Sequence, residues 1–217
     1  MELFFNNAGP CIPEDHYMID PLRRIDHERV EDLIAEKRYF VLHAPRQTGK
    51  TSCLLALMHH LNAQGHYQAL YANIEQAQAA HGNVKRGIAP IVESISSSAE
   101  HYLNNPSLLT WLKTNRQDYS AEFLLQALLK YWSTTTDKPT VLFLDEIDAL
   151  VGDTLISVLR QIRAGYAQRP QQFPLSIVLC GVRDVRDYRI ETQHKDCLLY
   201  TSPSPRDLST SRMPSSA

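Results

Sequence analysis

The sequence has few cysteines and no long apolar run. Its four cysteines, at positions 11, 53, 180 and 197, form no Cys-x-x-Cys pair and no Cys/His metal spacing, which is typical of thiols in a reducing compartment. No stretch approaches the roughly 18 apolar residues of a membrane helix. The N-terminus also lacks the basic region and apolar core of a secretory signal. We therefore expect a cytoplasmic protein without a membrane partner.

An excess of basic residues is absent as well. The 22 Lys and Arg residues face 24 Asp and Glu residues, for a net charge of −2, so no overall positive field attracts nucleic acid. A local basic patch is not excluded by this balance, which leaves nucleic acid open as a partner. The length of 217 residues, 43% of them hydrophobic, is enough to bury the core of at least one domain.

Short apolar strands alternate with helical patterns along the chain. The strands are expected at 39–43, 68–74, 140–144 and 175–180. The helical patterns cover 27–36, about 50 to 64, 77–131 with breaks near 81–82, 104–106 and 115–120, and 154–164. We expect Asp26 and Asp153 to cap helices and Gly65 and Gly165 to follow helix ends. Continuous apolar runs are typical of strands buried on both faces, so the sequence predicts an α/β fold with a parallel sheet.

The segment 197–217 differs in composition from the rest of the chain. Ser, Thr and Pro dominate it and no periodicity remains, which is typical of a disordered tail. A second interpretation, which we favour, comes from the genetic code. The stretches 197–207 and 211–217 can be spelled with the constant codons of a transposase-type sequencing adapter, and 208–210 would be the variable index. We therefore predict that the reading frame is cut near Asp196; sequencing the locus without that adapter tests this prediction.

The strongest motif is His-Ala-Pro-Arg-Gln-Thr-Gly-Lys-Thr-Ser at 43–52, between a strand and a helix. Such a turn directs backbone N–H groups at phosphate oxygens. We expect Gly49 to permit close approach, Lys50 to reach the β- and γ-phosphates, and the Thr51 hydroxyl to bind Mg²⁺. The alternative is that Gly-Lys-Thr occurs at the start of this helix by chance. The residues expected to contact the nucleotide are Ala44, Pro45, Arg46, Gln47, Thr48, Gly49, Lys50, Thr51 and Ser52.

Ala44 departs from the usual pattern of this motif, which has its first glycine at that position. If the position requires a positive φ, alanine costs on the order of 1 kcal/mol there. The lysine and the hydroxyl of the motif are intact, so we expect nucleotide binding to persist.

An acidic partner follows the third strand in Val-Leu-Phe-Leu-Asp-Glu-Ile-Asp at 141–148. We expect Asp145 to hold Mg²⁺ and Glu146 to polarise the attacking water, a contribution of roughly 10²–10⁴-fold in rate. An acidic turn after a strand is common by itself, but its occurrence together with the phosphate loop argues against coincidence. Asp148 either orients this loop or begins the cap of the next helix, and we favour the cap.

A basic residue follows the fourth strand in Cys-Gly-Val-Arg-Asp at 180–184. Ligands bind at the carboxyl edge of open parallel sheets, where Arg183 would reach the γ-phosphate and report its loss. The alternative is an ion pair between Arg183 and Asp184 or Asp187 on a solvated turn, and the residues alone do not separate the two.

Together these motifs resemble those of AAA-like P-loop ATPases, including prokaryotic STAND-type proteins and, in the Asp-Glu-Ile-Asp box, origin-recognition ATPases. The resemblance covers 1–196 and divides the chain into a lead-in segment (1–38), an incomplete ATPase core (39–196) and the non-native tail (197–217). It implies ATP and Mg²⁺ as ligands and a sheet in the order 5-1-4-3-2, with the fifth strand missing here. The catalytic residues that it implies are Glu146, Lys50 and Arg183.

The resemblance also implies contacts outside the core motifs. Part of the adenine site would lie between Pro13 and Pro21, with His16, Tyr17 and Met18 as candidates. A helical or winged-helix lid and any finger arginine in it would lie in the missing C-terminal region. We therefore expect weak or no turnover from 1–196 alone.

The function that we expect is hydrolysis of Mg-ATP by a conformational switch or remodelling motor. A protein partner, or a second copy of the chain, would bind through the missing C-terminal region. One alternative is a P-loop kinase for a small molecule, against which the Asp-Glu pair argues. Another is a non-catalytic nucleotide-dependent interaction module or DNA-loading adaptor, whose DNA contact would lie in the missing part because no basic stripe is visible.

Overall fold

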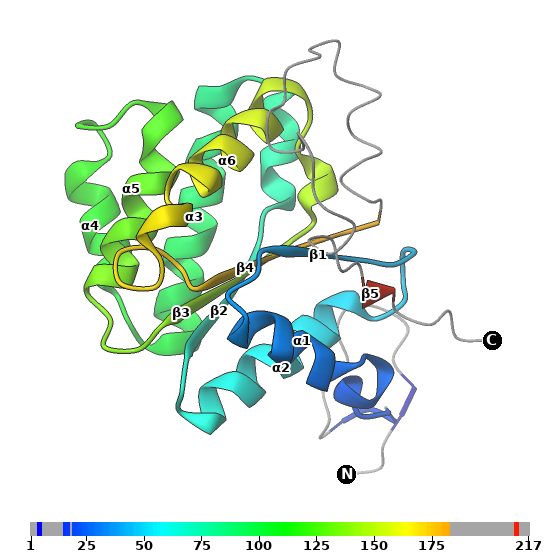
Figure 1. Ribbon diagram of the computed structural model, residues 1–217. Helices are drawn as coiled ribbons and strands as arrows, with labels where there is room; N and C mark the ends of the chain where they lie inside the picture. Colours follow the sequence, from blue (N-terminus) through cyan, green and yellow to red (C-terminus); the bar gives the residue numbers. More distant parts are fainter. Residues whose placement is uncertain (1–3, 6–14, 18, 183–210, 213–217) are drawn as a thin grey trace.

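A parallel sheet forms the centre of the structure (Figure 1). The computed structural model describes residues 4–5, 15–17, 19–182 and 211–212. The strands are β1 (Phe40–His43), β2 (Gln68–Asn73), β3 (Thr140–Asp145), β4 (Ser176–Gly181) and β5 (Ser211–Arg212). They lie in the order β2-β3-β4-β1-β5, and every neighbouring pair is parallel. The predicted α/β class and the predicted strand order are therefore confirmed.

The edge of the sheet beside β1 is paired with Ser211 and Arg212, which lie opposite Leu42 and His43. The physical reason is that the outer edge of a sheet presents unpaired N–H and C=O groups, to which an extended segment can bind. Ser211 and Arg212 belong to the tail that we predict to be non-native, so the absence of the family's own fifth strand stays a prediction. That 197–217 is foreign to the protein stays a prediction.

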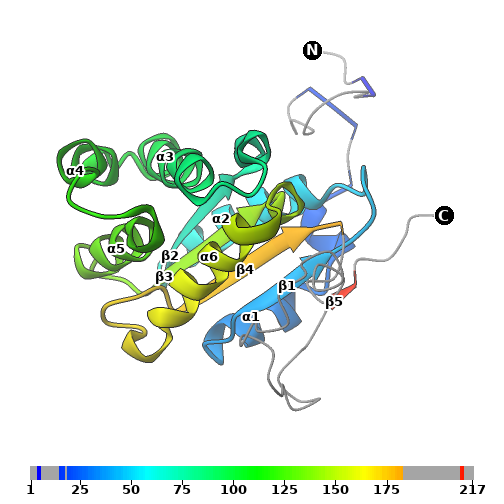
Figure 2. The ribbon, with the colours of Figure 1, turned by 90° about the horizontal axis from the view of Figure 1, so that it is seen from above.

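Helices cover both faces of the sheet (Figures 1 and 2). The helices α1 and α2 lie on one face, and α3, α5 and α6 lie on the other, with α4 packed on α3 and α5. The bounds of the α-helices are α1 (His27–Ala35), α2 (Lys50–Gln64), α3 (Val84–Leu103), α4 (Ser107–Asn115), α5 (Ala121–Thr134) and α6 (Gly152–Ala164). Short 3-10 turns lie between them, namely η1 (Pro21–Arg24), η2 (Glu75–Ala80), η3 (Ile147–Ala149) and η4 (Tyr166–Gln168). The predicted breaks in 77–131 are confirmed. None of the helices in these described ranges has both the length and the hydropathy that crossing a bilayer requires.

Each of the strands β1, β2, β3 and β4 contributes to two hydrophobic cores, because successive side chains of a strand point to opposite faces. The core against α3, α5 and α6 contains Val41, Leu142 and Leu179, among others. The core against α1 and α2 contains the neighbouring positions, such as Phe143 and Val178. Burial on both faces explains why the strands are apolar without alternation, as a covered parallel sheet requires.

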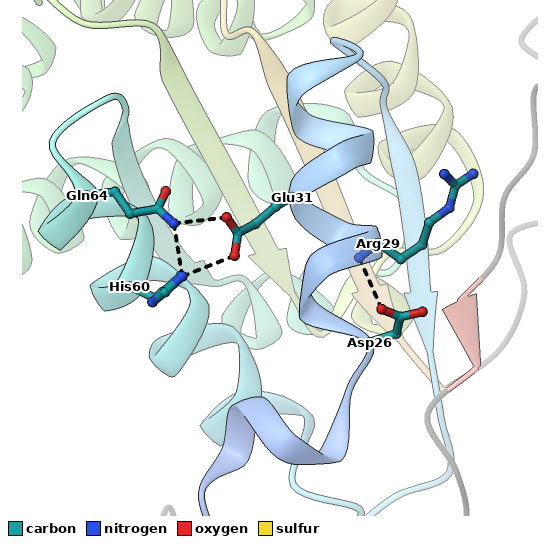
Figure 3. Close-up of polar contacts among 5 residues, drawn as sticks. All are labelled: Asp26, Arg29, Glu31, His60 and Gln64. Carbon is teal, nitrogen blue, oxygen red and sulfur yellow. Dashed lines mark hydrogen bonds and ion pairs between the residues drawn. The ribbon is translucent and has the colours of Figure 1, made fainter.

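The helix ends agree with the sequence signals at three of four positions. Asp26 caps α1, since its Oδ1 accepts a hydrogen bond from the Arg29 N–H at 3.1 Å (Figure 3). Gly65 ends α2 in the left-handed conformation at φ 77°, and Gly165 follows α6. The prediction that Asp153 caps α6 is wrong. The helix begins at Gly152 with Val151 at the N-cap, so Asp153 lies in the first turn. Its negative charge there interacts favourably with the helix dipole.

A polar contact joins the lead-in helix α1 to α2 (Figure 3). The Glu31 carboxylate accepts a hydrogen bond from Gln64 Nε2 at 2.9 Å, and its other oxygen lies 3.0 Å from His60 Nε2. Gln64 and His60 also bond each other at 3.0 Å. The contact holds α1 against the helix whose N-terminus bears the phosphate loop.

Candidate functional site

The predicted motifs meet at the carboxyl edge of the sheet, where β1, β3 and β4 end. The loop after β1 is bonded to the end of β4, because the Ala44 N–H donates to the Gly181 carbonyl at 3.3 Å. This edge is where open parallel sheets bind ligands.

The loop 44–49 is a tight turn that leads into α2. Gln47 and Gly49 have positive φ angles of 60° and 79°. Ala44 is not among the positive-φ residues and is buried. The penalty considered for alanine at this position is therefore absent, and the strained non-glycine residue of the loop is Gln47.

The Lys50 ammonium lies inside this loop. Its Nζ donates to the carbonyls of Ala44 at 3.0 Å and Pro45 at 2.9 Å, and the residue is 7% exposed. Thr48 Oγ1 also donates to the Pro45 carbonyl, at 2.8 Å. Both of these acceptors are neutral carbonyls, so neither contact is an ion pair. The first amides of α2, which follow Gly49, have no side-chain cap, so this end combines free N–H donors with a cation, as an anion site requires.

The Asp145 carboxylate is fully buried and accepts hydrogen bonds from side chains and from the backbone. Thr51 Oγ1 donates to its Oδ2 at 2.7 Å, Tyr71 OH to the same oxygen at 3.1 Å, and the Glu146 N–H to its Oδ1 at 3.0 Å. The bond from Thr51 joins the phosphate loop and the acidic strand in one site.

The side-chain oxygen atoms of Thr51 and Asp145 suit a magnesium ion. Mg²⁺ prefers hard oxygen ligands, keeps several waters and takes one or two carboxylates together with phosphate oxygens. The Thr51 hydroxyl and the Asp145 carboxylate supply such atoms 2.7 Å apart. Across the part of the chain that the structure describes, no group of three or more His, Cys, Asp or Glu side chains could hold a metal ion. A cation here would need phosphate and water to complete its shell.

Glu146 has an unusual backbone and an altered acidity. Its φ of 62° and ψ of 43° lie in the left-handed region, which costs roughly 1–2 kcal/mol for a non-glycine residue. Burial raises the pKa of its carboxyl, and the Asp145 charge adds to this, while the Lys50 ammonium opposes it. A carboxyl whose pKa is raised lies closer to the range that suits proton transfer near neutral pH.

Sequence reasoning missed two residues of this site. Tyr71 on β2 bonds Asp145, and burial and the Asp145 carboxylate raise the pKa of its phenol, so the phenol stays a donor. Arg24 in η1 lies against the phosphate loop, since a Cβ added to Gly49 would meet its Nη1 at 2.7 Å. A tyrosine within a strand is typical of an apolar core, so no sequence signal marked Tyr71. For Arg24 the sequence offered a weak signal, because the residue lies in the lead-in segment before β1, where the resemblance places part of the nucleotide site.

Asp148 does not cap α6, so the favoured prediction for it is wrong. Its Oδ2 accepts a hydrogen bond from the Val182 N–H at the end of β4, because η3 turns the residue toward β4 before α6 begins. This supports the other interpretation, in which Asp148 orients the loop.

The remaining candidates are less well placed. Arg183 and Met18 lie outside the described residues. His16 and Tyr17 pack against the rings of Phe4 and Phe5, with centroid distances of 4.7 Å and 5.1 Å. Their contact with adenine stays a prediction.

Comparison with known proteins places this geometry in a wider context. A family model described as an AAA domain matches residues 34–188. Among solved structures, the chain is similar to the Drosophila ORC bound to GC-rich DNA and Cdc6, with 12% identity, a TM-score of 0.56, and coverage of 90% of this chain and 29% of that one. It is also similar to a Walker-type ATPase of Pyrococcus abyssi, with 16% identity, a TM-score of 0.55, and coverage of 81% and 48%. The chain thus spans less than half the length of either protein. A search of curated protein sequences finds no significant match.

Proposed function

Because the chain belongs to the AAA domain family, we propose that it binds Mg-ATP and hydrolyses it as a conformational switch or remodelling motor. The observation that carries this proposal is the 2.7 Å hydrogen bond from Thr51 Oγ1 to Asp145 Oδ2, which joins the phosphate loop to the acidic strand. The Walker-type ATPase of similar fold adds support for this class of activity.

The phosphate chain would bind at the N-terminus of α2. The backbone amides of the loop and of the first helical turn would donate to phosphate oxygens. Lys50 would exchange its two carbonyl acceptors for the β- and γ-phosphates, a charge-assisted contact that is stronger than the contacts it replaces. Arg24, which lies against Gly49, adds a second positive charge beside the same loop.

The acidic residues would supply the remaining chemistry. Thr51 and Asp145 would hold Mg²⁺, which when bound neutralises charge on the phosphates. Glu146 would orient the attacking water and take its proton, a role that its raised pKa supports. Arg183, beyond the described end of β4, is our candidate for contact with the γ-phosphate.

Calorimetry with Mg-ATP tests the binding half of the proposal. Lys50→Ala should lose a charged contact worth about 2–5 kcal/mol, which weakens binding by roughly 30-fold or more. Lys113→Ala, on the exposed surface of α4, is the matched control and should bind as the parent chain does. Absence of any Mg-ATP binding by the parent chain at millimolar concentration would refute the proposal.

Phosphate release by the full-length protein tests the hydrolytic half, because we expect weak or no turnover from 1–196 alone. Glu146→Gln should keep the affinity for Mg-ATP and lower turnover by about 10²–10⁴-fold, because the amide cannot take a proton from water. If the Glu146→Gln variant hydrolyses ATP at the parent rate, Glu146 does not take the proton from the attacking water. Transfer of phosphate to an added small molecule rather than to water would identify a kinase instead.

A further inference from the structure

Three chain segments meet at the end of β4. The Gly181 carbonyl accepts a hydrogen bond from the Ala44 N–H of the phosphate loop at 3.3 Å. The next residue, Val182, donates its N–H to Asp148 Oδ2 in the turn η3. The Gly181 carbonyl and the Val182 N–H, at the end of β4, therefore bind the phosphate loop on one side and the turn after Glu146 on the other.

The contact between η3 and β4 is unusually close. A Cβ added to Gly181 would lie 2.5 Å from Asp148 Oδ2 and 2.9 Å from Ile147 Cγ2, distances that real Cβ atoms do not show. Glycine at 181 is therefore required for the carboxylate of Asp148 to reach the Val182 N–H. This spatial need, rather than a positive φ, explains the glycine at this position.

The turn that Asp148 holds carries the strained residue Glu146. A non-glycine residue in the left-handed region persists only where its surroundings hold it there. The Glu146 N–H is bonded to Asp145 Oδ1 at 3.0 Å, and its carbonyl accepts from the Ala149 N–H at 3.0 Å. The bond from Val182 to Asp148 holds the same short turn from the side of β4.

We infer that Asp148 is a positioning residue, which fixes the turn bearing Glu146 to the end of β4 and so couples Glu146 to the phosphate loop through Gly181 and Val182. The inference rests on the proposed function, because the coupling matters only if the loop binds a phosphate ligand. Asp148 acts through Glu146 and need not touch the nucleotide. Binding of a phosphate ligand in the loop would then affect the position of Glu146 through the backbone at the end of β4.

Amide hydrogen exchange at Val182 tests the contact in the full chain without nucleotide. Asp148→Ala should accelerate exchange of the Val182 N–H by about tenfold or more, because the amide loses a charged acceptor. Asp148→Asn should retain most of the protection, since the side-chain amide oxygen still accepts. Asp118→Ala, at an exposed position, is the control and should leave Val182 unchanged. Equal exchange in the parent chain and in Asp148→Ala would overturn the inference.

Binding and turnover of Mg-ATP then test the coupling. Asp148→Ala should bind Mg-ATP within about threefold of the parent and show a kcat lower by roughly 10²-fold with KM little changed, because misplacement of a catalytic group costs about this much. Asp148→Asn should restore most of that kcat. Addition of Mg-ATP should alter Val182 exchange in the parent chain and in Asp148→Asn, but not in Asp148→Ala.

The outcomes separate the two proposals. A parent chain that binds no Mg-ATP refutes the proposed function, whereas the exchange comparison without nucleotide still tests the Asp148 contact. A parent chain that binds Mg-ATP, with an Asp148→Ala variant that keeps both kcat and the exchange response, refutes the positioning role alone. Gly181→Ala is the second variant, should Asp148→Ala fail to fold. Its methyl group should displace Asp148 and reproduce the loss of Val182 protection, and unchanged protection would contradict the inference.

Discussion

Replacing Tyr71 with phenylalanine is expected to lower the free energy of unfolding by about 1.5–3 kcal/mol, the cost of a lost hydrogen bond to a charged group. The Tyr71 hydroxyl donates to Asp145 Oδ2 at 3.1 Å, and Asp145 is 0% exposed, so water cannot replace the lost donor. The donors from Thr51 and from the Glu146 N–H remain in the variant. The phenylalanine ring keeps the packing of the tyrosine, so the loss reports the hydroxyl alone.

Urea denaturation followed by circular dichroism measures this loss. With a slope of about 2 kcal/mol per molar urea, the midpoint should fall by roughly 0.8–1.5 M while the slope stays constant. Tyr102→Phe is the matched control, because Tyr102 packs on Tyr71 with ring centroids 6.2 Å apart, and it should cost less than about 0.5 kcal/mol. If Tyr71→Phe is no more destabilising than this control, the hydroxyl does not support Asp145 and our description of the site is wrong.

Three further predictions concern acidity, packing and the phosphate loop. Without nucleotide, Glu146→Gln should raise the melting temperature near neutral pH, because burial and the Asp145 charge raise the pKa of Glu146 and disfavour its ionised form; thermal melts should show the gain shrinking as the pH falls through that pKa. Gly165→Ala should cost about 1–3 kcal/mol in urea denaturation, since the added methyl would overlap the buried ring of Phe173. Ala44→Gly should leave Mg-ATP affinity in calorimetry within about twofold and lower stability by about 0.4–1 kcal/mol, because Ala44 needs no positive φ.

Features that depend on neighbours within a few residues could be predicted from the sequence. The cap at Asp26 and the left-handed end at Gly65 follow from local hydrogen bonds and local backbone sterics. The phosphate loop and the Asp-Glu pair are recognisable for the same reason, since each is a short run of residues at the end of an apolar strand. The prediction for Asp153 is wrong because α6 begins one residue earlier, at Gly152, which has a positive φ of 54°.

Contacts across the sheet could not be predicted in this way. Tyr71 reaches Asp145 because β2 lies beside β3 with Tyr71 opposite Phe143, so the tyrosine shares a face with the acid two residues further along. Asp148 reaches Val182 because β4 lies on the other side of β3 and has a glycine where the two segments touch.

The amino-acid sequence by itself determined the class of fold and the residue types of the phosphate loop and the acidic strand, and the family resemblance of these motifs implied the strand order. The tertiary structure alone decided which side chains hold these residues in place, namely Tyr71, Arg24 and Asp148. The physical reason is one of range. Apolar periodicity and turn chemistry act over a few residues, whereas a hydrogen bond between strands requires a register that the packing of the whole sheet sets.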